Sequence, residues 1–263
     1  MKVSVGDDTV YAYTGTRTTS ANAPAVVLVH GAAQDHSAWA LQSRYLAHHG
    51  MSVYAVDMPG HGRSDGAALG SVGAIADWLV RFLDATGVRN AALVGHSLGA
   101  LAVLDASARH PDRVSRIALL GPAVPMAVSD ELIAAAGTDD HVAYELINGW
   151  AFGSRGQIGG NPWPGIWMSG NAMRLMERSR PGVLHTDLVA CRDYASGLVA
   201  AASVRAPALV IRGARDVMAP PASAQALIGA LADVRELTLE GCGHSMMSEA
   251  PDATLAALRS FLA

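Results

Sequence analysis

Residues 91–109 read AALVGHSLGALAVLDASAR and predict a buried strand that turns sharply into a helix. Ala91 to Gly95 is short and apolar, as a strand inside a parallel sheet requires, and Leu98 to Arg109 is rich in helix-favouring alanine and leucine. Between them lies Gly-x-Ser-x-Gly, with Ser97 at its centre. The glycines leave room where side chains would collide in so sharp a turn. The turn presents the Ser97 hydroxyl at a helix N-terminus, so Ser97 is a candidate nucleophile, or alternatively a simple helix cap.

Short apolar runs alternate with amphipathic stretches on both sides of this turn, which is typical of a largely parallel sheet with helices on its faces. The predicted strands are an opening hairpin, Val3–Val5 and Thr9–Tyr13, followed by Ala25–His30, Val53–Asp57, Ala91–Gly95, Ile117–Leu120, Ala208–Arg212 and Arg235–Leu239. An amphipathic helix is expected before Gly87, and a terminal helix after Pro251. The sequence therefore predicts an α/β fold with eight strands.

The alternation stops between residues 122 and 201, where no convincing strand pattern is found. This region has helical patterns and a loop rich in glycine, proline and tryptophan: Asp130–Ala136, Val142–Gly149, Ala172–Arg178, Asp187–Tyr194 and the loop at 153–167. So long a break in a compact domain indicates an inserted subdomain. We expect a core made of residues 1–121 and 202–263 and a helical cap at 122–201 over the carboxyl edge of the sheet.

Composition excludes several classes of protein. The chain has 263 residues, 51% hydrophobic and 16% charged, and a formal net charge of −4, which excludes disorder and disfavours nucleic acid as a partner. Asp7 and Asp8 interrupt any apolar signal segment, and no run is long enough for a membrane span. The two cysteines cannot build a disulfide framework. We expect a cytoplasmic protein with no membrane partner, and the sequence does not indicate its oligomeric state.

A serine hydroxyl needs a base within hydrogen-bond reach, and that base needs a third group to orient it. His244, in Gly-Cys-Gly-His, follows the last predicted strand, and Asp216, in Gly-Ala-Arg-Asp, follows the strand before it. Because the carboxyl ends of parallel strands meet at one edge of a sheet, these residues are expected near Ser97. The predicted catalytic residues are Ser97, Asp216 and His244.

Two further motifs stand at the ends of earlier predicted strands. His30-Gly31 follows one, and Asp57-Met58-Pro59-Gly60-His61-Gly62-Arg63-Ser64 follows the next. Together with the serine turn and the Asp216 and His244 loops, they make the chain resemble the α/β-hydrolase fold family over nearly its whole length, in its serine-nucleophile, esterase-like branch. The resemblance implies an oxyanion hole made by the backbone N–H groups of Ala32 and Leu98, with Ala33 as the alternative to Ala32.

The other histidines and acids have simpler interpretations. His30, His61 and His96 lie within motifs, but we expect their rings to bond nearby backbone, and Asp57 to fix the Gly60–Ser64 turn. No metal-binding histidine pattern and no Gly-x-Gly-x-x-Gly motif occurs, so neither a metal nor a nicotinamide or flavin cofactor is predicted.

Aromatic residues cluster in the predicted cap and could form an apolar wall that binds the substrate. Trp150, Trp163 and Trp167 are candidate substrate-binding residues together with Met246 near the base, although large rings can equally build the cap's own core. The function expected from the resemblance is hydrolysis of a small, largely apolar ester, thioester or lactone through an acyl-enzyme on Ser97. The alternatives are a cofactor-free perhydrolase, a carbon–carbon bond hydrolase or an acyltransferase with the same three residues, and a non-catalytic small-molecule receptor.

Overall fold

The computed structural model describes residues 1–160 and 166–263 and contains an eight-stranded sheet. Its strands are β1 (Lys2–Val5), β2 (Asp8–Tyr13), β3 (Ala25–Val29), β4 (Ser52–Val56), β5 (Ala91–His96), β6 (Val114–Leu120), β7 (Ala208–Gly213) and β8 (Val234–Leu239). They lie in the order β1-β2-β4-β3-β5-β6-β7-β8. The β1–β2 and β2–β4 pairs are antiparallel and the others are parallel, so the predicted α/β fold is confirmed.

Alternate strand residues point to opposite faces of the sheet, and each face has its own apolar core. Val27 and Val29 of β3 join the cluster on one face, while Val26 and Leu28 join the cluster on the other. The first face is covered by α2 (Val72–Ala85), α3 (Leu98–Arg109), α9 (Gly197–Ser203) and α10 (Gln225–Ala230), and the second by α1 (Ala40–His48), α11 (Met246–Glu249) and α12 (Pro251–Leu262). Three 3₁₀ helices complete these layers: η1 (His36–Trp39), η2 (Pro111–Arg113) and η3 (Pro221–Ala224). A sheet buried on both faces explains why its central strands are almost continuously apolar.

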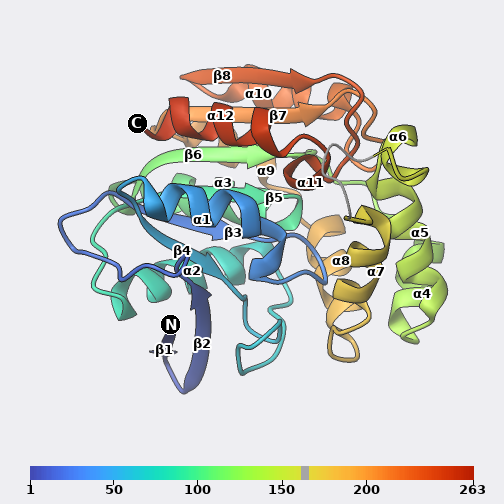
Figure 1. Cartoon of the computed structure of the whole chain (residues 1–263), viewed down its shortest axis with the longest axis horizontal. Coiled ribbons are helices and arrows are strands. Elements are labelled where there is room, and N and C mark those ends of the chain that lie inside the picture. The colour runs from blue at the N-terminus through green and yellow to red at the C-terminus, as the bar shows by residue number, and fades with distance from the viewer. Residues whose placement is uncertain (161–165) are drawn as a thin grey trace.

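Most of the chain between β6 and β7 forms helices that lie beyond the carboxyl ends of the parallel strands (Figure 1). They are α4 (Asp130–Gly137), α5 (His141–Ala151), α6 (Ser154–Gln157), α7 (Met168–Met176) and α8 (Val183–Arg192). Their apolar residues form a separate cluster that includes Leu132, Met176 and Leu188. Helix α9, which the predicted cap at 122–201 includes almost to its end, packs instead against α3 and α10. The division into core and cap stays a prediction, with α9 on the core side of it.

Helix length bears on the membrane prediction. The longest helix among the described residues, α2, has 14 residues, whereas crossing a bilayer takes about 20. No helix in the described ranges is both long and apolar enough to span a membrane.

Candidate active site

Ser97 occupies a strained turn between β5 and α3. Its backbone angles are φ 54° and ψ −119°, in a region that residues with a side chain rarely adopt. A Cβ at Gly95 would collide with the carbonyl oxygen of Gly99, and one at Gly99 with the carbonyl oxygen of Val29. Glycine at these two positions therefore lets β5, α3 and the end of β3 approach closely, and Ser97 is held at the crossing.

Asp216 and His244 form a buried, hydrogen-bonded pair at the carboxyl ends of β7 and β8. Asp216 Oδ2 lies 2.7 Å from His244 Nδ1, and Asp216 Oδ1 accepts the N–H groups of Met218 (2.9 Å) and Ala219 (2.8 Å). Because the carboxylate only accepts, Nδ1 carries the proton and Nε2 of the neutral ring is an acceptor. Nε2 is buried and has no hydrogen-bond partner within residues 1–160 and 166–263. The ring is thus oriented by Asp216 and keeps a free basic nitrogen.

Backbone contacts fix the loop that carries His244. His96 Nε2 donates to the His244 carbonyl oxygen at 2.9 Å, and burial, reinforced by the nearby His244, lowers the pKa of His96 well below its usual value. Glu249 Oε1 accepts the Gly243 N–H at 2.9 Å, and the Ser245 N–H donates to the Ala151 carbonyl of α5 at 2.9 Å. His96 is therefore a neutral structural contact of the His244 loop, and α5 is bonded to the same loop.

The two alanines after His30-Gly31 differ in position. Ala32 lines the cavity that also contains Ser97 and His244, whereas Ala33 is buried and its N–H donates to Asp187 Oδ2 at 2.9 Å. Because that N–H is already bonded, Ala33 is a poor alternative to Ala32 as an oxyanion donor. Leu98 begins α3, and the first N–H groups of a helix have no acceptor within the helix.

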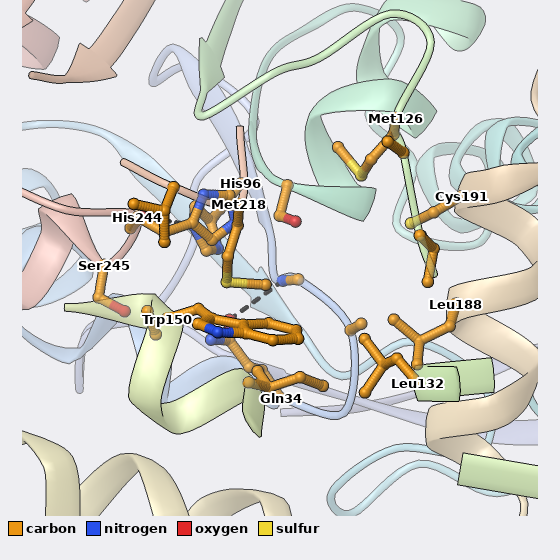
Figure 2. Close-up of a pocket in the computed structure, with 18 of the residues that line it drawn as sticks. Gln34, His96, Met126, Leu132, Trp150, Leu188, Cys191, Met218, His244 and Ser245 are labelled. Atoms are coloured by element: carbon orange, nitrogen blue, oxygen red, sulfur yellow. Dashed lines mark hydrogen bonds between the residues drawn. The ribbon is translucent and has the colours of Figure 1, made fainter. Parts of the chain in front are cut away.

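A cavity of about 470 Å³ opens over Ser97. Figure 2 shows His244 and Met218 at one end, Leu132 and Leu188 at the other, and Trp150 along one wall. Most of the wall is apolar, and the lining residues within the described ranges include no Asp, Glu, Lys or Arg: Gly31, Ala32, Gln34, His96, Ser97, Met126, Ala127, Val128, Ser129, Leu132, Ile147, Trp150, Ala151, Leu188, Cys191, Val217, Met218, His244 and Ser245. The cavity suits an uncharged, apolar group.

The four predicted substrate-binding residues have four different positions. Trp150 lines the cavity. Trp167 does not: it is 68% exposed, and its ring lies against Gly170 in the first turn of α7. Met246 is fully buried in the apolar cluster between the sheet and α12, so it is a core residue. Trp163 lies outside the described residues. The wall is completed by four residues that were not predicted from the sequence: Leu132, Leu188, Met126 and Met218.

The His30 ring bonds backbone, as expected, whereas the His61 ring bonds both the Pro59 carbonyl and the Asp187 carboxylate. His30 Nδ1 donates to the Gly31 carbonyl at 2.8 Å, and Nε2 accepts the Met58 N–H at 3.1 Å. Asp57 Oδ2 accepts the Arg63 N–H at 2.9 Å and so fixes the turn at residues 60–64.

One cluster of the described residues has the composition of a metal site. Asp35, His36 and Asp57 each offer one possible ligand atom, and these three atoms lie within 4.8 Å of one another. Existing bonds account for these groups, since Asp57 Oδ1 pairs with His36 Nδ1 at 2.7 Å and Asp35 caps Ser37 and pairs with Arg178. The cluster is explained as part of the protein's own hydrogen bonding.

Comparisons with known proteins agree with this architecture. The model of the family described as alpha/beta hydrolase fold matches residues 24–251. A pimeloyl-acyl-carrier-protein methyl ester esterase of Aromatoleum aromaticum is 29% identical over 247 residues, which cover 88% of this chain and 95% of that relative.

Solved structures share the fold. An enol-lactonase from Burkholderia xenovorans superposes with a TM-score of 0.89 at 24% identity, covering 100% of this chain and 99% of that one. An esterase from Exiguobacterium antarcticum gives 0.86 at 19% identity, covering 99% of this chain and 98% of that one. At such identities the likeness shows the fold alone. With the family match over most of its length, the chain belongs to the α/β-hydrolase fold family.

Proposed function

We propose that this protein is a serine hydrolase that cleaves a small, largely apolar carboxylic ester, thioester or lactone through an acyl-enzyme on Ser97. In the first step the Ser97 hydroxyl attacks the substrate carbonyl, and its proton passes to Nε2 of His244. Asp216 holds the ring and stabilises its charged form. The tetrahedral oxyanion accepts hydrogen bonds from the N–H groups of Ala32 and Leu98. His244 then gives the proton to the leaving oxygen or sulfur. Water repeats the sequence on the acyl group and frees Ser97.

One arrangement carries the proposal: a His244 whose Nδ1 is bonded to buried Asp216 at 2.7 Å and whose free Nε2 belongs to the same cavity as Ser97. The Ser97 hydroxyl is not bonded to Nε2 in this structure, and such contacts commonly tighten only when substrate binds. Serine as the nucleophile disfavours epoxide opening and halide displacement, for which members of this family use aspartate. The sequence Ala32-Ala33-Gln34 likewise departs from the glycine-rich oxyanion loop of carbon–carbon hydrolases.

The experiment that tests this function is turnover of p-nitrophenyl butyrate by the purified protein. A serine hydrolase releases p-nitrophenol over many turnovers. A small-molecule receptor of the same fold would release none above the uncatalysed rate, and that result would remove the proposal.

The uncharged cavity predicts discrimination between two acyl groups of equal length. p-Nitrophenyl hexanoate should be hydrolysed with a kcat/KM at least about 100-fold above that of the mono-p-nitrophenyl ester of adipic acid, because a carboxylate buried without a partner costs several kcal/mol. Leu132 and Leu188 line the end of the cavity away from His244, where the acyl chain would end.

A matched variant checks that the wall causes this preference. Leu188→Arg should lower the ratio of the two kcat/KM values at least about tenfold, because it supplies a cation at the end of the cavity away from His244. Equal kcat/KM values for the two esters in the unmodified protein would contradict an apolar acyl site.

A further inference from the structure

A single carboxylate oxygen joins three separate segments behind the oxyanion loop. Asp187 of α8 is 1% exposed, and its Oδ2 accepts the Ala33 N–H and contacts His61 Nε2, both at 2.9 Å. Ala33 lies in the loop after β3 and His61 in the turn after β4. A buried side chain of α8 therefore bonds the loop that carries the candidate oxyanion donor.

Hydrogen-bond geometry makes His61 a cation. Its Nδ1 lies 2.9 Å from the Pro59 carbonyl oxygen and its Nε2 2.9 Å from the Asp187 carboxylate, and both oxygens can only accept. Both ring nitrogens therefore carry protons. Burial opposes this charge, but Asp187, the Pro59 carbonyl and Asp57 together outweigh it and raise the pKa of His61. The neighbouring His30 ring, 4.8 Å away between centroids, is neutral, because burial and His61 lower its pKa to about 4.

Ala33 needs this support because its backbone is strained. Its φ of 52° is in the left-handed region, which is uncommon for a residue with a side chain. The cap holds both of its polar groups, since Asp187 accepts its N–H and Ser179 Oγ donates to its carbonyl at 3.1 Å. Its methyl group belongs to the apolar cluster of the cap. The conformation of Ala33 is thus determined by the cap rather than by the loop itself.

The peptide planes on either side of Ala32 are consequently fixed by different groups. The Gly31 carbonyl accepts from His30 Nδ1 at 2.8 Å and from the Gln34 N–H at 3.3 Å, so the Ala32 N–H of the same peptide points the opposite way. The next peptide is held by Asp187 through the Ala33 N–H. Loss of the bond to Asp187 releases the peptide that follows Ala32, so that this residue keeps only one of its two anchors.

We propose that Asp187, paired with protonated His61, is a positioning residue that holds the Ala32 N–H in the oxyanion hole, so that the cap contributes to catalysis as well as to substrate binding. This inference rests on the proposed function, because an oxyanion hole matters only if Ser97 forms a tetrahedral adduct. Asp187 itself touches neither substrate nor reacting atoms.

The test is Asp187→Asn, which keeps the size of the side chain but removes the charge that His61 requires. We expect kcat for p-nitrophenyl butyrate to fall about 30- to 100-fold with KM within about threefold, since a misplacement of about 1 Å at the reacting centre costs about 100-fold. Affinity for phenylethylboronic acid should fall by the same factor, because its tetrahedral adduct with Ser97 places an oxygen in the oxyanion hole. Asp193→Asn, at the exposed end of α8, is the matched control and should change neither value.

Two further measurements keep the test decisive if Asp187→Asn does not fold. Ser179→Ala removes the bond to the Ala33 carbonyl and should lower kcat about three- to tenfold at unchanged KM, in line with one lost hydrogen bond of about 1 kcal/mol. In the unmodified protein, nitrogen NMR of His61 at pH 7 should show both ring nitrogens protonated.

Three results would overturn the proposal. They are a folded Asp187→Asn variant with unchanged kcat and boronic acid affinity, a rise in KM alone, or, where that variant does not fold, a Ser179→Ala variant with unchanged kcat. Failure of the proposed function has a different signature. In that case the unmodified protein itself would neither react with a fluorophosphonate nor bind the boronic acid, and the inference about Asp187 would fall with it.

Discussion

Ser97→Ala is expected to lower kcat for p-nitrophenyl butyrate about 10⁵- to 10⁶-fold, the loss that follows removal of a nucleophile acting as a unit with its base. Alanine removes only the Oγ atom. The remaining activity would come from the binding cavity and the oxyanion donors, which act without the serine. The measurement is steady-state hydrolysis with protein free of contaminating esterase.

The structure indicates that this variant folds. The turn at Ser97 depends on the close approach that Gly95 and Gly99 allow, and the Ser97 side chain makes no helix-capping hydrogen bond. The melting temperature should therefore change little. Ser115→Ala is the control and should keep full activity, because Ser115 is exposed and lies at the start of β6, away from the carboxyl ends of the strands. The expected loss of kcat in Ser97→Ala is about 10⁵-fold. If the variant instead retained more than about a hundredth of the activity, Ser97 would be excluded as the nucleophile.

Asp216→Asn has the second-largest expected effect, a loss of about 10⁴-fold in kcat. Asp216 Oδ1 accepts two backbone N–H groups, from Met218 and Ala219. An asparagine must keep its oxygen toward those donors, so its NH₂ group faces His244 Nδ1. That nitrogen becomes an acceptor, the ring proton moves to Nε2, and the base can no longer take the proton of Ser97.

The comparison that isolates this effect is Asp252→Asn, an exposed acid in the first turn of α12. It should leave kcat within about twofold of the unmodified protein, as surface substitutions usually do. Unchanged turnover in Asp216→Asn would show that another group orients His244. A lower melting temperature without loss of kcat would limit Asp216 to holding its own loop.

The fold was predictable because its signals are local. The central parallel strands are short apolar runs, and all eight strands of the sheet were expected within a few residues of their observed bounds. The start of β6 was missed by three residues, since Ser115 and Arg116 are both polar and the strand pairs irregularly with β5 there. Helices α6, α9, α10 and α11 were not predicted, because four to seven residues give too few turns for a periodic pattern.

The candidate site was predictable in part for the same reason. Ser97, Asp216 and His244 each follow a strand end, and parallel strands bring those ends together. The walls of the cavity depend on how the cap folds over them, which local sequence does not specify. Trp167 was selected for its type, yet its ring lies outside the cavity, while Met218 enters the wall from the Asp216 loop.

Asp187 illustrates what sequence reasoning could not reach. It is separated from Ala33 by 154 positions and from His61 by 126, and only the docking of α8 brings them together. Its one sequence signal is an acid at a position that the helical pattern buries. A buried carboxylate requires a partner, and that partner cannot be identified before the tertiary structure is known.

Labelling of the unmodified protein with a fluorophosphonate, followed by peptide mapping, tests most directly whether Ser97 is an activated nucleophile. The expected result is one phosphonyl group per chain, attached to Ser97, with the reaction slowed by p-nitrophenyl hexanoate and greatly reduced in Asp216→Asn. A protein that turns over esters without taking up the label, or that carries it on another residue, would contradict the assignment of Ser97.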